Sequence, residues 1–315
     1  MGWIDSNEGT GSGRRNPSIL IAFIIAAVGF FMYMNQSEPN PITGEKQRVS
    51  LSPQQEIQLG LQSAPEMAAQ MGGEVPLSDP RAQEVANIGK KIVQGTNARK
   101  GPWKFQFHLL NDPKTVNAFA LPGGQIFITV GLLNQLQTEA QLAGVLAHEV
   151  GHVIQRHSAQ QLAKNQLGQI LVMATGVGAS DPSNYQRGQQ AAMIASVVNQ
   201  MTQLHYGRGD ELEADQWGLQ LMTQIGYTPK AMLEVMKILE QASPQGHQPE
   251  MLLTHPYPKH REEYIKNFIE KNPQTLKLSE GRKLKEVFTS NEYDQNNRLI
   301  PEDSQNLFFS RERFR

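Results

Sequence analysis

His148-Glu149-Val150-Gly151-His152 is the stretch around which this 315-residue sequence is organised. The two histidines are four residues apart, so on a helix they lie one turn apart on the same face. That spacing lets two imidazole rings bind one zinc ion, at about 2.0–2.1 Å each. Glu149 lies between them, where a carboxylate can accept a proton from a metal-bound water. The stretch therefore predicts a zinc site with its own general base.

The residues around this motif predict a helix over 138–158. Thr138 and Gln141 match a capping box, and no proline interrupts the segment. Gly144 and Gly151 each cost a helix about 1 kcal/mol relative to alanine, which indicates close packing by another segment. A buried helix in which both histidines are only hydrogen-bonded core residues is the alternative.

A second motif, over 207–215, offers a third ligand. Glu211 and Asp215 are four residues apart, and Glu211 would complete a two-histidine, one-glutamate set that leaves the fourth position to water. Asp215 would accept a hydrogen bond from the far nitrogen of a zinc histidine, with His148 favoured. Glu213 is the competing carboxylate, but its two-residue offset points it elsewhere on the helix. The alternative for this segment is a solvated, acidic helix start.

The two motifs and their surroundings resemble the zinc metallopeptidase family (HExxH gluzincins) that includes HtpX, BepA and the CAAX prenyl endopeptidases. The similar segments are NAFALPGGQIFITVGLL (117–133), HEVGH (148–152), ELEAD (211–215) and LLTHP (252–256). The resemblance covers roughly 52–271. It implies a zincin-like fold with one zinc ion per chain, bound by His148, His152 and Glu211, and Glu149 as the general base. The chain departs from some members, since it has no cysteine for lipidation and lacks the multiple membrane spans of HtpX.

The resemblance also places His255 near the zinc, where it could occupy the open coordination position and hold a resting state. His205, Tyr206 and Arg208 are candidates for stabilising the oxyanion formed during hydrolysis. The sequence does not choose among these three. An equally supported alternative is that they only pack against or cap the start of the following helix. Four further histidines are expected at the surface: His108 on a strand, and His157, His247 and His260.

Residues 125–130 alternate polar and apolar after the turn at Pro122-Gly123-Gly124, and so predict a strand. The apolar residues would face the core, and the alternate positions would face outward. The resemblance places this strand at the upper edge of the cleft, where an extended peptide could add by main-chain hydrogen bonds. An ordinary hairpin strand is the alternative. The predicted substrate-binding residues are Gly124, Gln125, Phe127 and Thr129.

Length and composition limit the classes of protein that fit. The chain is long enough for one large domain or two small ones. A net charge of −1 and a pI near 6.7 give no reason to expect nucleic acid. The absence of cysteine excludes disulfides and zinc–thiolate sites. We expect an α+β, mainly helical fold with a small sheet; the oligomeric state stays open.

The N-terminal region predicts a membrane anchor. Residues 1–17 are polar and predicted to be disordered, and 18–34 carry no charge. As a helix, 18–34 would span about 25 Å, at the short end for a bilayer core. Arg14 and Arg15 favour a cytoplasmic N-terminus and an exported catalytic domain, which predicts a single-pass protein of the inner membrane. A cleaved signal peptide is the alternative.

The rest of the chain divides into a linker over 35–50, a peptidase domain over 51–272 and a polar C-terminal extension over 273–315. Within the domain, helices are expected over 53–71 and 80–95, and a strand over 103–110. A helical pair is expected between the zinc motifs, where 167–177 could instead contact a membrane surface.

The sequence as a whole predicts a membrane-anchored zinc metalloendopeptidase. The resemblance implies that unfolded or misassembled envelope proteins are its substrates. Two other classes stay open. One is a catalytically latent, zinc-binding scaffold that holds unfolded proteins like a chaperone. The other is a structural zinc site, which the two-histidine, one-glutamate set disfavours because structural sites are usually closed by four protein ligands.

Overall fold

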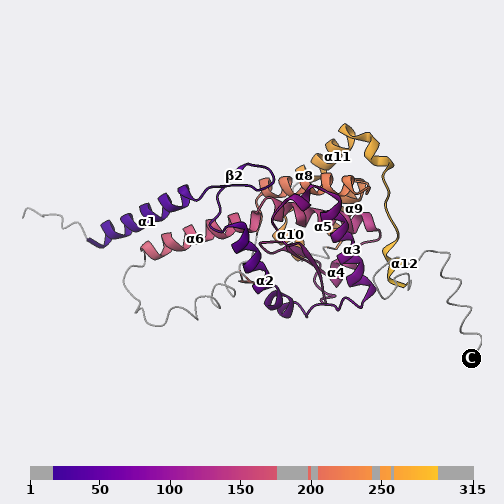
Figure 1. Cartoon of the computed structure of the whole chain (residues 1–315), viewed down its shortest axis with the longest axis horizontal. Coiled ribbons are helices and arrows are strands. Elements are labelled where there is room, and N and C mark those ends of the chain that lie inside the picture. Colours follow the sequence, from indigo (N-terminus) through magenta and orange to yellow (C-terminus); the bar gives the residue numbers. More distant parts are fainter. Residues whose placement is uncertain (1–16, 176–197, 200–204, 243–248, 257–258, 290–315) are drawn as a thin grey trace, which may run out of the picture.

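The computed structural model describes residues 17–175, 198–199, 205–242, 249–256 and 259–289. Helices surround a small sheet of three described strands in the order β3-β5-β4 (Figure 1). β3 (Gln106–Leu110) runs parallel to β5 (Gln125–Thr129), and β4 (Ala118–Ala120) runs antiparallel to it. The predicted α+β, mainly helical class is confirmed.

The helices before the sheet start where the sequence predicts. α2 (Pro53–Gln70) begins with a complete capping box between Ser52 and Gln55. α3 (Pro80–Gly95) begins after Asp79, whose side chain accepts from the Arg81 backbone N–H. α3 packs against β3 and against the helix that carries the first motif. These caps are local interactions, which is why sequence patterns locate them well.

That motif helix, α5 (Glu139–Ile154), is buried along its entire length. Thr138 caps it and accepts from the Gln141 N–H, as predicted. The Gln141 side chain, however, accepts from the backbone N–H of Gln137 instead of Thr138, so only half of the predicted capping box forms. α5 packs against α3, α8 (Arg208–Gln224) and α9 (Lys230–Gln241), which makes it the central helix of the core.

Glycines allow α5 and α8 to cross closely. A Cβ atom at Gly151 would lie 2.9 Å from the Ala214 carbonyl oxygen and 3.0 Å from the Trp217 Cβ. A Cβ atom at Gly218 would lie 3.2 Å from the His148 backbone nitrogen. A larger residue at either position would force the helices apart. The predicted close approach at Gly151 is therefore confirmed, and it brings the acidic motif on α8 beside the histidines on α5.

The prediction that alternate residues of β5 face outward is wrong. β5 is the central strand of the sheet, with β3 on one side and β4 on the other, so it offers no free edge to a peptide. Gln125 is 1% exposed, and Phe127 and Thr129 are 0% exposed. The reason is a second hydrophobic cluster, in which α2 covers the face of the sheet that was expected to be open. This cluster includes Leu59, Met67, Phe119 and Phe127.

The polar side chains of β5 are satisfied inside the protein. The Thr129 hydroxyl donates to the Thr115 carbonyl oxygen at 2.6 Å, and the Gln125 amide donates to the Lys104 carbonyl oxygen at 3.1 Å. Gly124 has a φ of +107° and is also buried. In this position these four predicted residues support the sheet, and none of them is available to a substrate.

The predicted linker is docked on the end of α5. β1 (Glu38–Pro39) and β2 (Lys46–Gln47) form a short antiparallel ladder. Asn40 donates to the Ile154 carbonyl oxygen at 2.7 Å, and Gln47 donates to the Gln155 carbonyl oxygen at 2.9 Å. The last carbonyls of a helix have no partner within it, so these amides satisfy groups that the helix leaves free.

Further helices pack around this core. They are α4 (Val130–Leu133), α10 (Glu250–Thr254), α11 (Lys259–Lys271) and α12 (Leu284–Thr289), with 3-10 turns η1 (Asn97–Lys100) and η2 (Pro273–Lys277). Part of the predicted C-terminal extension packs on the start of α5. The Arg282 guanidinium donates to the Glu139 carboxylate at 2.6 Å, and Leu284 is buried.

α1 (Pro17–Asn35) and α6 (His157–Thr175) lie side by side and project from the body of the molecule (Figure 1). α1 corresponds to the predicted anchor segment. Among the described residues, no helix combines the length and the apolar character needed to cross a membrane. The predicted second helix between the zinc motifs, over 191–204, lies outside the described residues except for 198–199.

Candidate metal centre

Three predicted ligands converge where α5 crosses α8. The His148 and His152 Nε2 atoms are 3.0 Å apart. One Glu211 carboxylate oxygen lies 3.5 Å from His148 Nε2, and the other lies 3.5 Å from His152 Nε2. A tetrahedral zinc ion with bonds of about 2.0–2.1 Å requires its ligand atoms to be about 3.3–3.4 Å apart. The separations between these ligand atoms therefore fit one zinc ion.

His255 lies on the fourth side of this cluster. Its Nδ1 atom is 3.0 Å from Glu211 Oε1, and its side chain is buried. One possible ligand atom from each of His148, His152, Glu211 and His255 falls within 4.8 Å of the others. The loop that carries His255 is held in place, because the Tyr206 N–H donates to the Thr254 carbonyl oxygen. His255 therefore lies where a fourth ligand would bind.

Glu149 is buried beside the cluster. Neither of its carboxylate oxygens has a hydrogen-bond partner among the described residues, and His255 Nε2 lies 3.7 Å from Oε1. Burial raises the pKa of Glu149, while the neighbouring His255 and His148 lower it. A buried carboxylate that lacks donors is costly unless another group satisfies it. Both oxygens are thus free to bond a water or a substrate atom.

Asp215 lies beside the far nitrogen of His148, the position that the sequence predicts: its Oδ1 atom is 3.0 Å from His148 Nδ1. Burial lowers the pKa of His148, but hydrogen bonds with Asp215 and Glu211 outweigh it and raise the pKa to about 9. A metal ion bound here would take the place of the proton on His148 Nε2, and the Asp215 carboxylate would then orient the ring through Nδ1–H.

Arg261, on α11, is a site residue that the sequence did not reveal. Its guanidinium donates to both oxygens of Asp215 at 2.6 and 2.7 Å, and Nη1 lies 2.7 Å from Glu211 Oε2. Burial opposes ionisation of Glu211, but the neighbouring His255 and Arg261 hold its pKa well below the usual value. The sequence did carry one signal for such a residue. The site was predicted to contain three carboxylates, Glu149, Glu211 and Asp215, and buried carboxylates require a cation nearby.

Of the three oxyanion candidates, the structure brings Tyr206 to the site. Its ring stacks on His152 with centroids 4.0 Å apart, and its hydroxyl lies 3.0 Å from Ser158 Oγ. Burial raises the pKa of Tyr206 well above its usual value, so the hydroxyl keeps its proton and can donate. His205 is exposed and bonds the Leu253 carbonyl oxygen, and Arg208 is also exposed.

The surface prediction for His157 is wrong. His157 is 2% exposed, and its Nδ1 atom lies 2.9 Å from His152 Nδ1. The break between α5 and α6 turns this ring toward the zinc motif, which periodicity could not predict. His260 is exposed as predicted, and His247 lies outside the described residues. Glu213 points away from the ligand cluster, as predicted, and contacts His157 instead.

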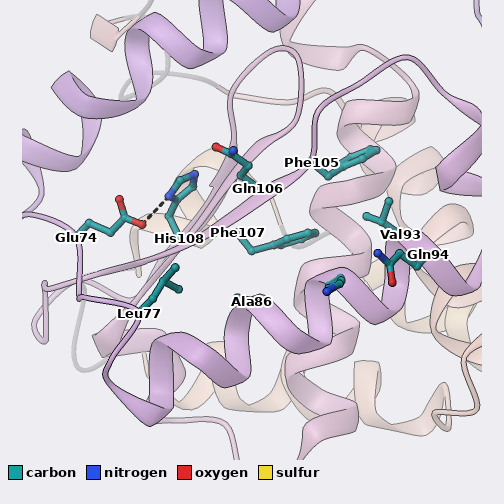
Figure 2. Close-up of a pocket in the computed structure, with 10 residues that line it drawn as sticks. Glu74, Leu77, Ala86, Val93, Gln94, Phe105, Gln106, Phe107 and His108 are labelled. Carbon is teal, nitrogen blue, oxygen red and sulfur yellow. Dashed lines mark hydrogen bonds and ion pairs between the residues drawn. The ribbon is translucent and has the colours of Figure 1, made fainter. Parts of the chain in front are cut away.

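A cavity of about 440 Å³ lies elsewhere, between α3 and β3 (Figure 2). Leu77, Phe105 and Phe107 line it, and a hydrogen bond of 2.8 Å between His108 and Glu74 lies at one side. No residue of the metal centre lines this cavity. A smaller pocket does adjoin the metal centre, and His148, His255 and Arg261 are among the residues that line it.

Comparison with known proteins supports the same assignment. The model of Peptidase family M48 matches residues 79–269. The beta-barrel assembly-enhancing protease of Escherichia coli (strain K12) is 30% identical over 294 residues, which cover 90% of this chain and 59% of that protein. The same-named protease of Yersinia pestis is 32% identical over 236 residues, which cover 70% of this chain and 45% of that protein.

A mitochondrial relative is also similar. The mitochondrial metalloendopeptidase OMA1 of Schizosaccharomyces pombe is 29% identical over 248 residues, covering 78% of this chain and 70% of that protein. The chain spans 59% and 45% of the length of these two bacterial relatives. The matched region contains the zinc-binding motif on α5 and the acidic motif on α8. The predicted family resemblance is confirmed, and the chain belongs to peptidase family M48.

Proposed function

We propose that this protein is a zinc-dependent metalloendopeptidase. One observation carries the proposal: the buried Glu149, with both carboxylate oxygens unpaired among the described residues, lies beside a two-histidine, one-glutamate ligand set. A structural zinc site has no use for a free base at this position, and it is usually closed by cysteines. Hydrolysis of a peptide bond requires such a base.

The chain's own residues would divide the work of hydrolysis. When bound by His148, His152 and Glu211, zinc supplies Lewis-acid polarisation of the scissile carbonyl and makes water more acidic. Glu149 accepts the proton from the attacking water and passes it to the leaving amine. The Tyr206 hydroxyl, protonated and buried beside His152, is the donor best placed to stabilise negative charge on the carbonyl oxygen.

The test is hydrolysis of unfolded casein by the purified full-length chain, with zinc quantified in the same sample. We expect about one zinc per chain and cleavage that a chelator abolishes and added zinc restores. A protein that contains zinc but leaves casein intact would favour the latent scaffold. A protein that binds no zinc would contradict the ligand assignment.

The position of His255 supports the alternative function, a catalytically latent scaffold. Because its ring already lies against Glu211 and faces Glu149, it can compete with water or substrate for the open position. We expect His255→Ala to raise the casein hydrolysis rate several-fold, since a larger fraction of molecules would be competent. Equal or lower activity, at unchanged zinc content, would show that His255 does not hold a resting state.

For the biological role, we propose hydrolysis of unfolded or misassembled envelope proteins. The support is the similarity to bacterial proteases whose name is beta-barrel assembly-enhancing. The measurement is accumulation of misassembled envelope proteins in cells that express the chain with Glu149→Gln compared with the unaltered chain. Identical protein profiles in the two strains would contradict this role.

We also propose that α1 attaches the protein to the inner membrane, with the N-terminus in the cytoplasm and the catalytic domain outside it. The support is the exposure of large apolar side chains on α1, such as Phe23 at 71% and Phe31 at 66%. Deletion of residues 17–35 should move the protein from the membrane fraction to the soluble fraction. If the shortened protein stays with the membrane, α1 is not the attachment.

A further inference from the structure

A chain of polar contacts leads away from the second zinc histidine on the side opposite the ligand cluster. His152 Nδ1 lies 2.9 Å from His157 Nδ1, and His157 Nε2 lies 3.2 Å from Glu213 Oε2. The His157 side chain is 1% exposed, whereas that of Glu213 is 50% exposed. The chain of contacts therefore begins at a buried ligand and ends at a carboxylate near the surface.

Zinc binding allows only one arrangement of protons along this chain. His152 must offer the Nε2 lone pair to the metal, so its proton is on Nδ1. That Nδ1–H can be donated only if His157 Nδ1 accepts, which places the His157 proton on Nε2. The His157 Nε2–H then donates to the Glu213 carboxylate. With zinc bound, each ring nitrogen of His152 and His157 would face a group that matches its role as donor or acceptor. Packing of the His157 ring alone would not require this match.

The backbone is broken at the position that makes this contact possible. On an uninterrupted helix, five residues turn the chain through about 500°, so His157 would lie about 140° around the axis from His152. Instead, α5 ends at Ile154, Arg156 adopts a φ of +57°, and α6 begins at His157. The break brings the His152 and His157 rings to a centroid distance of 4.9 Å at an angle of 73°.

Buried contacts hold this break in place. The Arg156 guanidinium donates to the Glu56 carboxylate at 2.8 Å and to the Leu51 carbonyl oxygen at 2.6 Å. A positive φ is unfavourable for an arginine, so the surrounding structure must compensate for it. These contacts come from α2 and the segment before it, far from the motif in sequence.

We propose that His157, oriented by Glu213, is a positioning residue that fixes the tautomer and direction of the His152 ring. His157 would orient the His152 ring in the way that Asp215 would orient the His148 ring. The inference rests on the proposed function only in that His152 is taken as a zinc ligand. Outer partners of zinc histidines commonly change metal affinity by about 10–100-fold when they are removed.

The test is the zinc dissociation constant of the full-length protein, measured by competition with a chromophoric chelator. His157→Phe keeps an aromatic ring but removes the acceptor, and should weaken zinc binding about 10–100-fold. His157→Asn returns an acceptor near the Nδ1 position and should recover part of the affinity. Glu213→Gln, at a half-exposed side chain, should weaken binding several-fold without affecting folding.

Glu240→Gln provides the matched control, because it removes the same charge from an exposed position on α9 and should leave zinc binding unchanged. The absorption spectrum of the cobalt-loaded protein gives a second readout, since a misdirected His152 alters the ligand geometry. Thermal denaturation without metal shows whether each variant is folded. If His157→Phe does not fold, the zinc dissociation constants of Glu213→Gln and Glu240→Gln are compared instead. Equal values would then overturn the positioning role.

The positioning role of His157 and the zinc-ligand assignment fail in different ways. Tight zinc binding by the wild type, with unchanged affinity and cobalt spectrum in His157→Phe and Glu213→Gln, would overturn the positioning role and leave the proposed function intact. Absence of zinc binding by the wild type would instead refute the ligand assignment on which both depend. Weaker binding that His157→Asn partly restores supports the positioning role.

Discussion

Glu149→Gln is expected to lower kcat/KM for casein about 10²–10⁴-fold, the usual contribution of a general acid–base residue. Glutamine has nearly the same shape but cannot accept the proton from water at neutral pH. The zinc ligands stay in place, so zinc content should not change. The measurement is initial hydrolysis rate over a range of casein concentrations, with the metal quantified in each preparation.

The same substitution should not destabilise the fold. Neither Glu149 oxygen has a hydrogen-bond partner among the described residues, so no protein hydrogen bond is lost. Burial already disfavours the charged carboxylate, and a neutral amide removes that cost. We expect the melting temperature to be equal to or higher than that of the wild type. Glu240→Gln makes the same substitution at an exposed position, so it serves as the control and should keep full activity.

Two results would contradict the catalytic role of Glu149. One is hydrolysis by Glu149→Gln within a factor of ten of the wild type while zinc is fully bound. The other is a loss of activity that follows a loss of zinc, because the carboxylate would then support the metal instead of accepting a proton. Activity and zinc content therefore have to be measured on the same samples.

Arg156→Met is expected to lower the free energy of unfolding by about 3–5 kcal/mol, the usual cost of breaking a buried ion pair. Arg156 and its partner Glu56 are both buried, with an N–O separation of 2.6 Å. Burial raises the pKa of Glu56, and the arginine opposes that rise. Removal of Arg156 leaves Glu56 buried with only the Trp103 indole N–H as a remaining side-chain donor among the described contacts.

Urea denaturation of the full-length protein, followed by intrinsic fluorescence, measures this loss. The double variant Arg156→Met with Glu56→Gln should recover part of the stability, because the unpaired charge is gone. Arg81→Met removes an arginine from the more exposed pair with Asp79 and should cost no more than about 1 kcal/mol. A similar small cost for Arg156→Met would show that the buried pair does not hold the break between α5 and α6.

The sequence determined those parts of the protein that depend on short-range geometry. The spacing of His148 and His152, and of Glu211 and Asp215, fixes which side chains share a helix face, because a helix repeats every 3.6 residues wherever it occurs. The starts of α2 and α3 were also predictable, since a cap forms between residues two or three positions apart. The candidate metal ligands and the candidate base could thus be named from the sequence alone.

The tertiary structure decided which groups meet those helices from elsewhere in the chain. α2 covers the second face of the sheet, so the alternation in β5 did not produce an open face. Arg261 reaches the site from α11, and His157 reaches it only because Arg156 breaks the helix. Local patterns cannot reveal such contacts, because burial and charge pairing depend on segments that approach only when the chain has folded.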